Sequence, residues 1–452
     1  MSASNGKPKR LVSYPLYTMG DVGSGLYSVL PSILLMFYMT NVLGIPVALA
    51  TLAAFVPKIV DLISNPIIGG LSDRTRTRLG RRRPFMLLAA VTVMPTFAMM
   101  WIAPYKDPAA SAYFVLVMFS LCTLSFCCFV VPFFALNTEL ARDYHERTAL
   151  NSYRTSYTFT GAILAGAGAP LIVQMAGGGR HGYLVMGLVM GVIMSAVIFM
   201  TFTHAREPER SETDPVPTIR ETIAAIGSNR PFAILFGSYF VNITAGGLYG
   251  AVLAYFVTYV LGRGEGFLSV MFFMTYGASI VSIPFWGWIS RSTGKLLAFQ
   301  ASIVMSVVAS VSFFFISSAT PLPLIIAVVF VQGLSHGGVQ VFSFSMLADC
   351  VSQGNEGRDS ADASAAMFNA VFIAGEKLGF ASGALLGGLV FSATGLIATT
   401  QGSVAQPESA IDGIRVALSW LPAALNMAAV VMLLFYRPFE RKMLAQLKAA
   451  EI

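Results

Sequence analysis

Long apolar runs separated by short polar stretches make up almost the whole chain. A helix needs about 20 apolar residues to cross the hydrocarbon core of a bilayer, and these runs reach that length. We therefore predict twelve membrane-spanning helices. They are expected at 12–41, 46–72, 84–105, 111–138, 147–176, 181–204, 229–261, 264–290, 295–318, 321–351, 363–396 and 410–437.

Lys and Arg residues are distributed unevenly over the polar stretches. Most of the 29 lie in the N-terminus, in the loops after even-numbered helices and in the C-terminal tail. Basic residues are enriched in cytoplasmic loops, so we place both termini in the cytoplasm. An even number of spans agrees with that placement. The exceptions are Lys106, Arg180 and Arg263 in the other loops, Arg415 near the outer start of the twelfth span, and Lys58, Arg154 and Lys377 within spans.

The composition also indicates a membrane protein. Hydrophobic residues make up 56% of the 452 residues and charged residues 11%, and the mean hydropathy is +0.71. An ordinary soluble domain has about 25% charged residues, so soluble enzymes and disordered proteins are excluded. The net charge of +7 is explained by basic cytoplasmic loops, and we expect no nucleic-acid partner. The four cysteines lack metal-ligand spacing, and we expect neither a metal nor a cofactor.

The longest polar stretch, at 205–228, divides the chain into halves of six spans each. We predict an N-terminal bundle at 1–204, a cytoplasmic linker at 205–228, a C-terminal bundle at 229–437 and a cytoplasmic tail at 438–452 that forms a short amphipathic helix on the membrane surface. A weak internal repeat supports the division. It relates Gly70, Arg74 and the pair Gly80-Arg81 to Gly287, Arg291 and the pair Gly294-Lys295.

Several motifs resemble the glycoside–pentoside–hexuronide:cation symporter family. They are Tyr17-Thr-Met-Gly-Asp21-Val-Gly23, Lys58-Ile-Val-Asp61-Leu-Ile-Ser-Asn65-Pro66, the run from Gly70 to Pro84, Val131-Pro132-Phe133-Phe134-Ala135-Leu136, Tyr153-Arg154, Met346-Leu-Ala-Asp349 and Glu376-Lys377-Leu-Gly379. The resemblance implies an all-α membrane protein with the major facilitator fold, in which twelve transmembrane helices form two six-helix bundles.

Polar residues inside the spans are candidates for a substrate site, because a charge at bilayer depth is costly. Tyr17 and Asp21 lie on one stripe of the first helix. The resemblance implies that Asp21 binds sugar hydroxyls and that Phe134 stands where sugar permeases place a tryptophan against the sugar ring. Arg154 matches a sugar-site arginine of the family, and its guanidinium could bind a carboxylate, a phosphate or hydroxyls, or pair with Asp21. The alternative interpretation is that these residues serve packing between helices.

The eleventh and tenth helices provide two further candidates. Lys377 matches a family lysine that faces the central cavity, whereas its neighbour Glu376 is a departure from the family pattern. His336 lies near the middle of the tenth helix. Its imidazole either relays protons or hydrogen-bonds the substrate, or it is an ordinary core histidine. Gly375, Gly379, Gly383 and Gly387 form a stripe of small residues that predicts close helix packing.

Lys58, Asp61 and Asn65 share one face of the second helix. Asp61 matches the family's cation-site acid, but Asn65 and Val130 stand where the family has further acids, and Ser64 and Cys127 occupy its other positions. Sodium prefers several oxygen ligands. We therefore expect H⁺ as the coupling ion, or a uniporter if Lys58 stays paired with Asp61.

The basic loop after the second helix is expected to set topology and to clamp helix ends through charge pairs. Its candidate gating residues are Asp73, Arg74, Arg78 and Arg81.

Three functions compete at this stage. The first is a secondary transporter of a glycoside-like solute in the inner or plasma membrane, surrounded by lipids and acting as a monomer by alternating access. The second is a carrier of an amphiphile or lysolipid. The third, a membrane-embedded transferase, lacks convergent catalytic groups, so we expect no enzyme and no catalytic residues.

Overall fold

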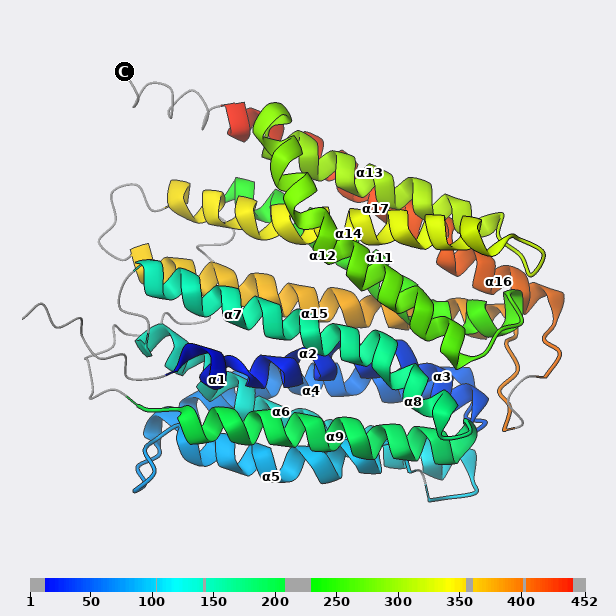
Figure 1. Ribbon diagram of the computed structural model, residues 1–452, viewed down its shortest axis with the longest axis horizontal. Coiled ribbons are helices and arrows are strands. Elements are labelled where there is room, and N and C mark those ends of the chain that lie inside the picture. Colours follow the sequence, from blue (N-terminus) through cyan, green and yellow to red (C-terminus); the bar gives the residue numbers. More distant parts are fainter. Residues whose placement is uncertain are drawn as a thin grey trace, which may run out of the picture. The chain divides into compact units, whose positions relative to one another are not determined.

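The computed structural model describes residues 13–102, 104–140, 144–207, 229–354, 361–400 and 404–441. Regular secondary structure within these residues is helical, and helices follow one another in the predicted order (Figure 1). Most of the predicted linker at 205–228 lies outside the described residues. The same is true of most of the predicted tail at 438–452, including its amphipathic helix.

The described helices account for all twelve predicted spans. Eleven helices in the described part of the chain are long and apolar enough to cross a membrane, and the shorter apolar helix Arg83–Met99 coincides with the third span. Some spans consist of two or three helical pieces joined by a π-helical turn or a single residue. The prediction of an all-α protein with twelve transmembrane helices is therefore confirmed.

The helices are assigned to the spans in chain order. The first half contains α1 (Tyr14–Thr18), α2 (Gly20–Leu30), η1 (Pro31–Leu35) and α3 (Met36–Asn41) in the first span, then α4 (Val47–Arg74), α5 (Arg83–Met99), α6 (Pro108–Leu140), α7 (Tyr144–Ile163) with η2 (Leu164–Gly168) and α8 (Ala169–Met175), and α9 (Gly179–His204). The second half contains α11 (Arg230–Tyr255) with η3 (Phe256–Val260), α12 (Glu265–Thr293), α13 (Lys295–Phe314), α14 (Leu322–Gly354), α15 (Ala361–Thr394), and α16 (Glu408–Leu418) with α17 (Trp420–Leu434).

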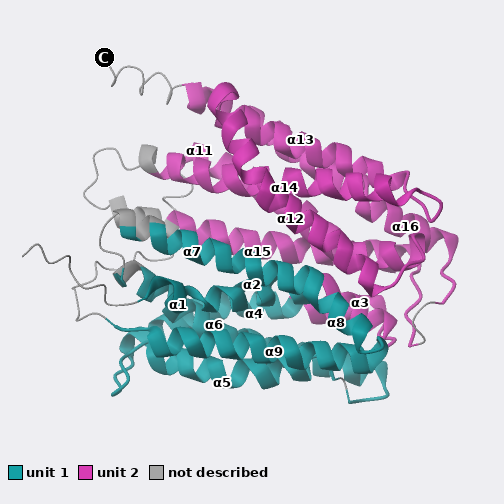
Figure 2. Cartoon of the chain, viewed as in Figure 1, with its two compact units in different colours: residues 1–31, 56–212 teal, residues 32–55, 213–452 magenta. Residues whose placement is uncertain are grey.

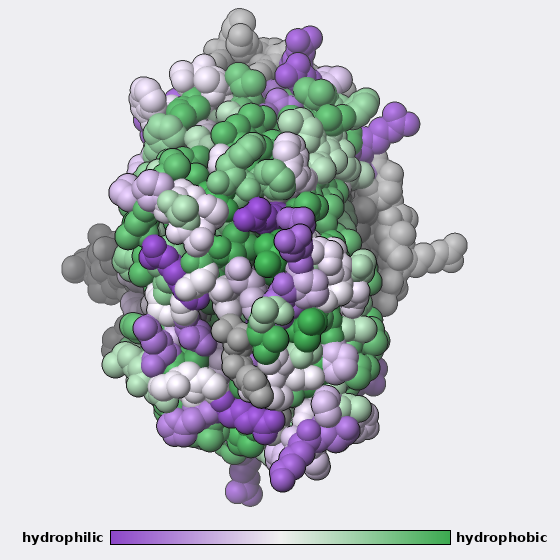
Figure 3. Space-filling model, turned by 90° about the vertical axis from the view of Figure 1, so that its right-hand side faces the viewer, coloured by the Kyte–Doolittle hydropathy of each residue, from purple (hydrophilic) through white to green (hydrophobic). Residues whose placement is uncertain are grey.

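Large apolar side chains are exposed along the helix surfaces. Val91 and Val281 are each 65% exposed, and Trp288 is 69% exposed. Exposed apolar surface on this scale is unusual in water but is expected where lipid tails are the solvent. At the loop ends that face the viewer in Figure 3, hydrophilic and hydrophobic residues are mixed.

The chain clusters into two compact units (Figure 2). Unit 1 comprises Met1–Pro31 and Val56–Glu212, and unit 2 comprises Ser32–Phe55 and Thr213–Ile452. The first two transmembrane helices thus contribute residues to both units. The predicted bundle boundary at 205–228 stays a prediction, because most of that stretch is not described.

The two units repeat one pattern of helix packing. In unit 1, α5 packs against α6 and α9, while α2 packs against α7 and α9. In unit 2, α13 packs against α14 and α17, while α11 packs against α15 and α17. The first and third transmembrane helices therefore have the same partners in their half as the seventh and ninth have in theirs. This is the packing expected of two related six-helix repeats.

Glycines let paired helices approach closely at equivalent places in the two units. In unit 1, Gly25 of α2 and Gly161 of α7 are so close that a Cβ atom on either would overlap backbone of the other helix. Gly247 of α11 and Gly383 of α15 have the same relationship in unit 2. Small residues at such crossings permit backbone contact that larger side chains would prevent.

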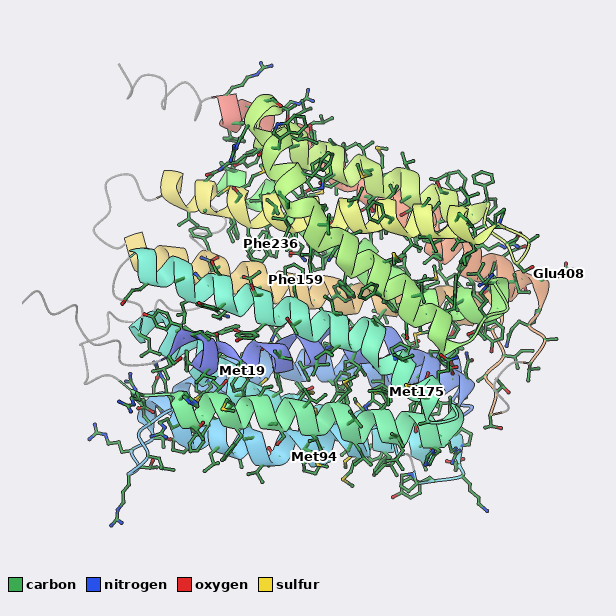
Figure 4. All side chains as sticks on the ribbon, viewed as in Figure 1. Met19, Met94, Phe159, Met175, Phe236 and Glu408 are labelled. Atoms are coloured by element: carbon green, nitrogen blue, oxygen red, sulfur yellow. The ribbon has the colours of Figure 1, made fainter. Side chains whose placement is uncertain are left out.

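The predicted glycine stripe of the eleventh span packs against α11. A Cβ atom on Gly375 would overlap the ring of Phe236, which is labelled in Figure 4. Gly379 faces the Phe240 carbonyl, and Gly387 faces Leu248. The expected packing role of this stripe is confirmed.

Candidate functional site

Asp21 and Arg154 form an ion pair inside unit 1. The Nε atom of Arg154 donates to Oδ2 of Asp21 at 2.9 Å. The Asp21 side chain is 2% exposed and that of Arg154 is 22% exposed. The pair lies beside the close contact of Gly25 with Gly161, which brings α2 and α7 near enough for a direct bond. An ion pair in this setting offers both acceptor and donor groups while its net charge is zero.

Aromatic rings from α6 line the guanidinium of Arg154. Its Cζ atom lies 4.4 Å from the ring centroid of Phe134 and 5.5 Å from that of Phe133. Tyr17 donates its hydroxyl to the Phe133 carbonyl at 3.2 Å, and the two rings lie 5.1 Å apart. The structure thus brings four sequence candidates together: Tyr17, Asp21, Phe134 and Arg154. Phe133 is a neighbour that the sequence analysis did not single out.

Asp61 lies in a second cluster of unit 1. It is 3% exposed, and its Oδ1 atom accepts from the Cys127 thiol of α6 at 3.0 Å. On the same face of α4, the amide oxygen of Asn65 is a buried acceptor with no hydrogen-bond partner among the described residues. The acid therefore has a thiol as one neighbour, where a second carboxylate would be needed to strengthen a sodium site.

The Lys58 ammonium lies between two aromatic rings. Its Nζ atom is 5.1 Å from the ring centroid of Tyr27 and 5.2 Å from that of Phe119. Cations are attracted to the faces of such rings, so the rings help to hold a positive charge inside the unit. Tyr27 is itself anchored, since its hydroxyl donates to Thr123 Oγ1 at 2.7 Å. Tyr27 and Phe119 could not be identified from the sequence, because aromatic residues are frequent in most of the spans.

The remaining two substrate candidates lie in unit 2. His336 is on α14, with its ring centroid 6.3 Å from that of Tyr276 in an edge-to-face arrangement. Lys377 is on α15. Neither belongs to the compact unit that contains Asp21 and Arg154.

The carboxylate of Glu207 caps the N-terminus of α5, where the basic loop ends. This cap was not predicted from the sequence. Glu207 follows α9 and accepts the backbone N–H groups of Arg81, Arg82 and Arg83 at 3.0, 2.8 and 3.1 Å. A negative charge at a helix N-terminus is stabilising, and here it satisfies three donors at once. The predicted gating residue Asp73 forms an ion pair with Arg82 at 3.6 Å.

Unit 2 contains a related cap. Glu440, which follows α17, accepts the backbone N–H of Leu296 at 3.2 Å at the start of α13. Gly80 and Gly294 precede the two capped helices and both have positive φ angles, of 103° and 86°. The weak sequence repeat at these glycines therefore marks a repeated structural feature. The nearby pair of Lys295 and Asp349, at 2.7 Å, further ties α13 to α14.

Among the described residues, no group of three or more His, Cys, Asp or Glu side chains is arranged to hold a metal ion.

Comparison with known proteins decides the family. Residues 16–438 match the family described as MFS/sugar transport protein. The chain belongs to this family. It is therefore a multi-pass membrane transporter that carries a small molecule, not an enzyme, and the sequence-based identification of the glycoside–pentoside–hexuronide:cation symporter family is confirmed.

Similar proteins include both sugar and lipid carriers. The chain is 27% identical to the inner membrane symporter YicJ of Escherichia coli (75% of this chain and 73% of that protein) and 25% identical to the isoprimeverose transporter of Lactiplantibacillus pentosus (96% and 90%). It is 23% identical to the sodium-dependent lysophosphatidylcholine symporter 1-B of Danio rerio (90% and 83%).

A solved structure confirms the major facilitator fold. The bacterial homolog of the human lysosomal transporter Spinster, in an inward-facing and unoccupied conformation, superposes with a TM-score of 0.67 at 15% identity. The match covers 96% of this family member and 97% of the other chain.

Proposed function

We propose that this transporter is a symporter that moves an uncharged glycoside or sugar-like solute by alternating access, driven by protons. The proposed substrate class is supported by the Asp21–Arg154 ion pair, whose guanidinium lies against the Phe134 ring. A carboxylate accepts from two adjacent hydroxyls, a guanidinium donates to hydroxyl or ring oxygens, and a phenyl face packs on the C–H face of a sugar. Because the pair is neutral overall, it favours a neutral polyhydroxylated solute over an anion.

The relatives support symport and the cellular location. One is named an isoprimeverose transporter and another an inner membrane symporter. We place this protein in the inner or plasma membrane as a monomer with both termini cytoplasmic, in accordance with the distribution of basic residues. His336 and Lys377, which belong to unit 2, stay proposed substrate-binding residues on the basis of the sequence alone.

Protons rather than sodium fit the neighbourhood of Asp61. The described neighbours of the carboxyl include the Cys127 thiol, which donates to it, and Lys58 lies one turn earlier on the same helix. A thiol is a poor ligand for a hard cation, and a nearby ammonium opposes a second positive charge. A proton needs only the one acid. If the Lys58 charge instead keeps Asp61 ionised throughout the cycle, the protein works as a uniporter.

Uptake into proteoliposomes tests this proposal. Purified protein is supplied with radiolabelled isoprimeverose, methyl glycosides or lysophosphatidylcholine, under an inward proton gradient or an inward sodium gradient. We expect accumulation of a glycoside under the proton gradient that a protonophore abolishes. Accumulation under sodium alone would overturn the coupling ion, and transport of the lipid without any glycoside would overturn the substrate class.

The aromatic wall of the site favours one alternative, a carrier of amphiphiles. Phe134 is partly exposed beside the charged pair, and the fully buried rings of Phe133 and Phe129 lie behind it with successive ring centroids 5.9 and 5.0 Å apart. The apolar face of Phe134 could therefore contact an acyl chain. A zwitterionic headgroup would also match a neutral pair of opposite charges. The lysophosphatidylcholine arm of the uptake experiment separates this function from glycoside transport.

A further inference from the structure

The first transmembrane helix of unit 1 is interrupted directly before Asp21. Its first piece, α1, ends just before Met19, and α2 begins at Gly20. The N–H group of Gly20, which a continuous α-helix would bond to the carbonyl four residues earlier, donates instead to Thr201 Oγ1 of α9 at 2.8 Å. The next turn contains a shorter bond, from the Val22 N–H to the Met19 carbonyl at 3.0 Å. The interruption is therefore held by a contact with the sixth transmembrane helix.

The interruption sets the position of the Asp21 carboxylate. Asp21 lies in the first turn of α2, where the free N–H groups of a helix favour a negative charge. Each residue of an α-helix advances about 100° around the axis, so the turn before Asp21 determines on which side of the helix the carboxylate lies. In the interrupted helix the carboxylate accepts from Arg154 of α7 at 2.9 Å. A first span that continued as one regular helix through Gly20 would turn the carboxylate away from this bond.

A second set of contacts leads from Gly20 to the same ion pair. A Cβ atom on Gly20 would overlap both the Phe129 ring and Thr201 Oγ1, so a side chain larger than hydrogen does not fit here. The Phe129 ring stacks on that of Phe133, with centroids 5.0 Å apart. The Phe133 centroid in turn lies 5.5 Å from Cζ of Arg154. The placement of Gly20 therefore affects both members of the ion pair.

Unit 2 makes the equivalent contact without interrupting its helix. The backbone crossings at Gly25 and at Gly247 give the two units a common register. Five residues before these glycines stand Gly20 in α2 and Asn242 in α11. Asn242 donates from its side-chain amide to Asn426 of α17 at 2.8 Å, and α11 is continuous at this place. The interruption is thus specific to the unit that contains the ion pair, and it forms where a side-chain acceptor meets a backbone donor.

We propose that Thr201 is a positioning residue for substrate binding. Its side chain is fully buried, and its oxygen keeps the first span interrupted so that the Asp21 carboxylate stays on Arg154. Without this oxygen, the Gly20 N–H either stays unpaired in a buried place or returns to its own helix, and both outcomes weaken the ion pair. The role in binding rests on the proposed function, whereas the effect on the ion pair does not.

The strength of the ion pair provides the first test. A double-mutant cycle of Asp21→Asn and Arg154→Ala measures the coupling within the pair without any substrate. The cycle is carried out by SDS titration of the purified protein in mixed micelles, in the wild type, in Thr201→Ser and in Thr201→Ala. Ser and Ala differ only in the oxygen atom that accepts from Gly20. We expect the coupling to be retained in Thr201→Ser and to fall by about tenfold, as an unfolding equilibrium constant, in Thr201→Ala.

The matched control is Thr203→Ala, at an exposed threonine of α9 whose hydroxyl donates to the Met200 carbonyl of its own helix. It should leave the coupling unchanged. Wild-type coupling in Thr201→Ala would overturn the proposal. If Thr201→Ala does not insert, Thr201→Cys takes its place, because sulfur is a weak acceptor and the coupling should fall below that of Thr201→Ser. Equal coupling in the Cys and Ser variants would then overturn the proposal.

Binding of radiolabelled isoprimeverose to the same variants provides the second test. We expect the affinity to fall by about tenfold in Thr201→Ala and to stay within about twofold of the wild type in Thr201→Ser and Thr203→Ala. Unchanged isoprimeverose affinity in a Thr201→Ala variant that has lost the coupling would overturn the role in binding. Absence of isoprimeverose binding in the wild type would count against the proposed substrate class and leave the coupling measurement valid.

Discussion

The Nε atom of Arg154 lies 2.9 Å from Oδ2 of Asp21, and this bond joins the first and fifth transmembrane helices of unit 1. Removing one partner leaves a buried charge uncompensated, which is strongly destabilising in a low-dielectric interior. The pair is therefore expected to control both the stability and the substrate affinity of the unit.

Single replacements of the pair should weaken substrate binding. For Asp21→Asn and for Arg154→Ala we expect affinity to fall on the order of tenfold or more, while the protein still inserts into the membrane. The double variant Asp21→Asn with Arg154→Ala should regain thermal stability relative to either single variant, because no unpaired charge remains, but it should not regain affinity. Calorimetric binding and thermal unfolding in detergent check both parts. Wild-type affinity in both single variants would remove the pair from the substrate site.

The face of the Phe134 ring should contribute to substrate binding by stacking. Phe134→Leu keeps an apolar side chain but loses the stack on Arg154, and we expect glycoside affinity to fall by about fivefold, corresponding to roughly 1 kcal/mol. Phe134→Trp should retain or improve binding. Phe199→Leu, at a residue that is 49% exposed on the helix surface, is the matched control and should bind normally. Equal affinities for Phe134→Leu and Phe199→Leu would contradict a stacking role.

Asp61 should be needed for accumulation rather than for translocation. In Asp61→Asn we expect exchange of substrate between equal concentrations to continue, while proton-driven accumulation is lost because no group carries the proton. Asp412→Asn, at an exposed acid of α16, should accumulate substrate normally. Uptake assays in proteoliposomes measure both modes. Sodium-stimulated accumulation that disappears in Asp61→Asn would show that the site binds sodium instead.

The cap formed by Glu207 should stabilise the start of α5. Glu207→Gln keeps the shape but removes the charge that accepts three N–H groups, so we expect the free energy of unfolding to fall by about 1–3 kcal/mol. Thermal unfolding measures the loss. Glu408→Gln, at the start of α16 (Figure 4), is the control, and it should lose only the helix-terminus interaction, about 0.3–1 kcal/mol. Equal melting temperatures for wild type and Glu207→Gln would show that the cap is not stabilising.

The crossing of α11 and α15 should reject any side chain larger than hydrogen. Gly383→Ala places a Cβ atom against the Thr244 carbonyl, which cannot move freely, so we expect a clear loss of stability, about 1–3 kcal/mol. Gly277→Ala in α12 has no neighbouring atom within 4 Å of the added Cβ and should be neutral or slightly stabilising. A fluorescence-based thermal scan compares the two, and a neutral Gly383→Ala would argue against the tight crossing.

Much of this architecture could be predicted from residue patterns alone. Lipid imposes a minimum length on each apolar run, so the twelve spans are visible before any contact is known. The stripe from Gly375 to Gly387 likewise indicates close packing through its spacing, although it does not say that the partner is α11. Asp21, Arg154 and Asp61 could be predicted as candidate functional residues, because charges at bilayer depth are rare.

Contacts between distant residues could not be predicted in the same way. Phe133, Tyr27 and Phe119 are three aromatic residues among many. Only the packing of α2, α4, α6 and α7 shows that Phe133 lies against Arg154 and that the other two lie against Lys58. Glu207 lies in a polar stretch among other charges, and its carboxylate becomes a cap because three N–H groups 124 to 126 residues away converge on it.

The amino-acid sequence by itself therefore determined the membrane class, the number of spans and the family, since these follow from local hydrophobicity and short motifs. Only the tertiary structure decided which polar residues meet. It paired Asp21 with Arg154, set the Cys127 thiol on Asp61, and brought the Phe134 ring against the Arg154 guanidinium. The physical reason is that a side chain's partner inside a membrane depends on the register and close approach of neighbouring helices, which glycine contacts set across more than one hundred residues of chain.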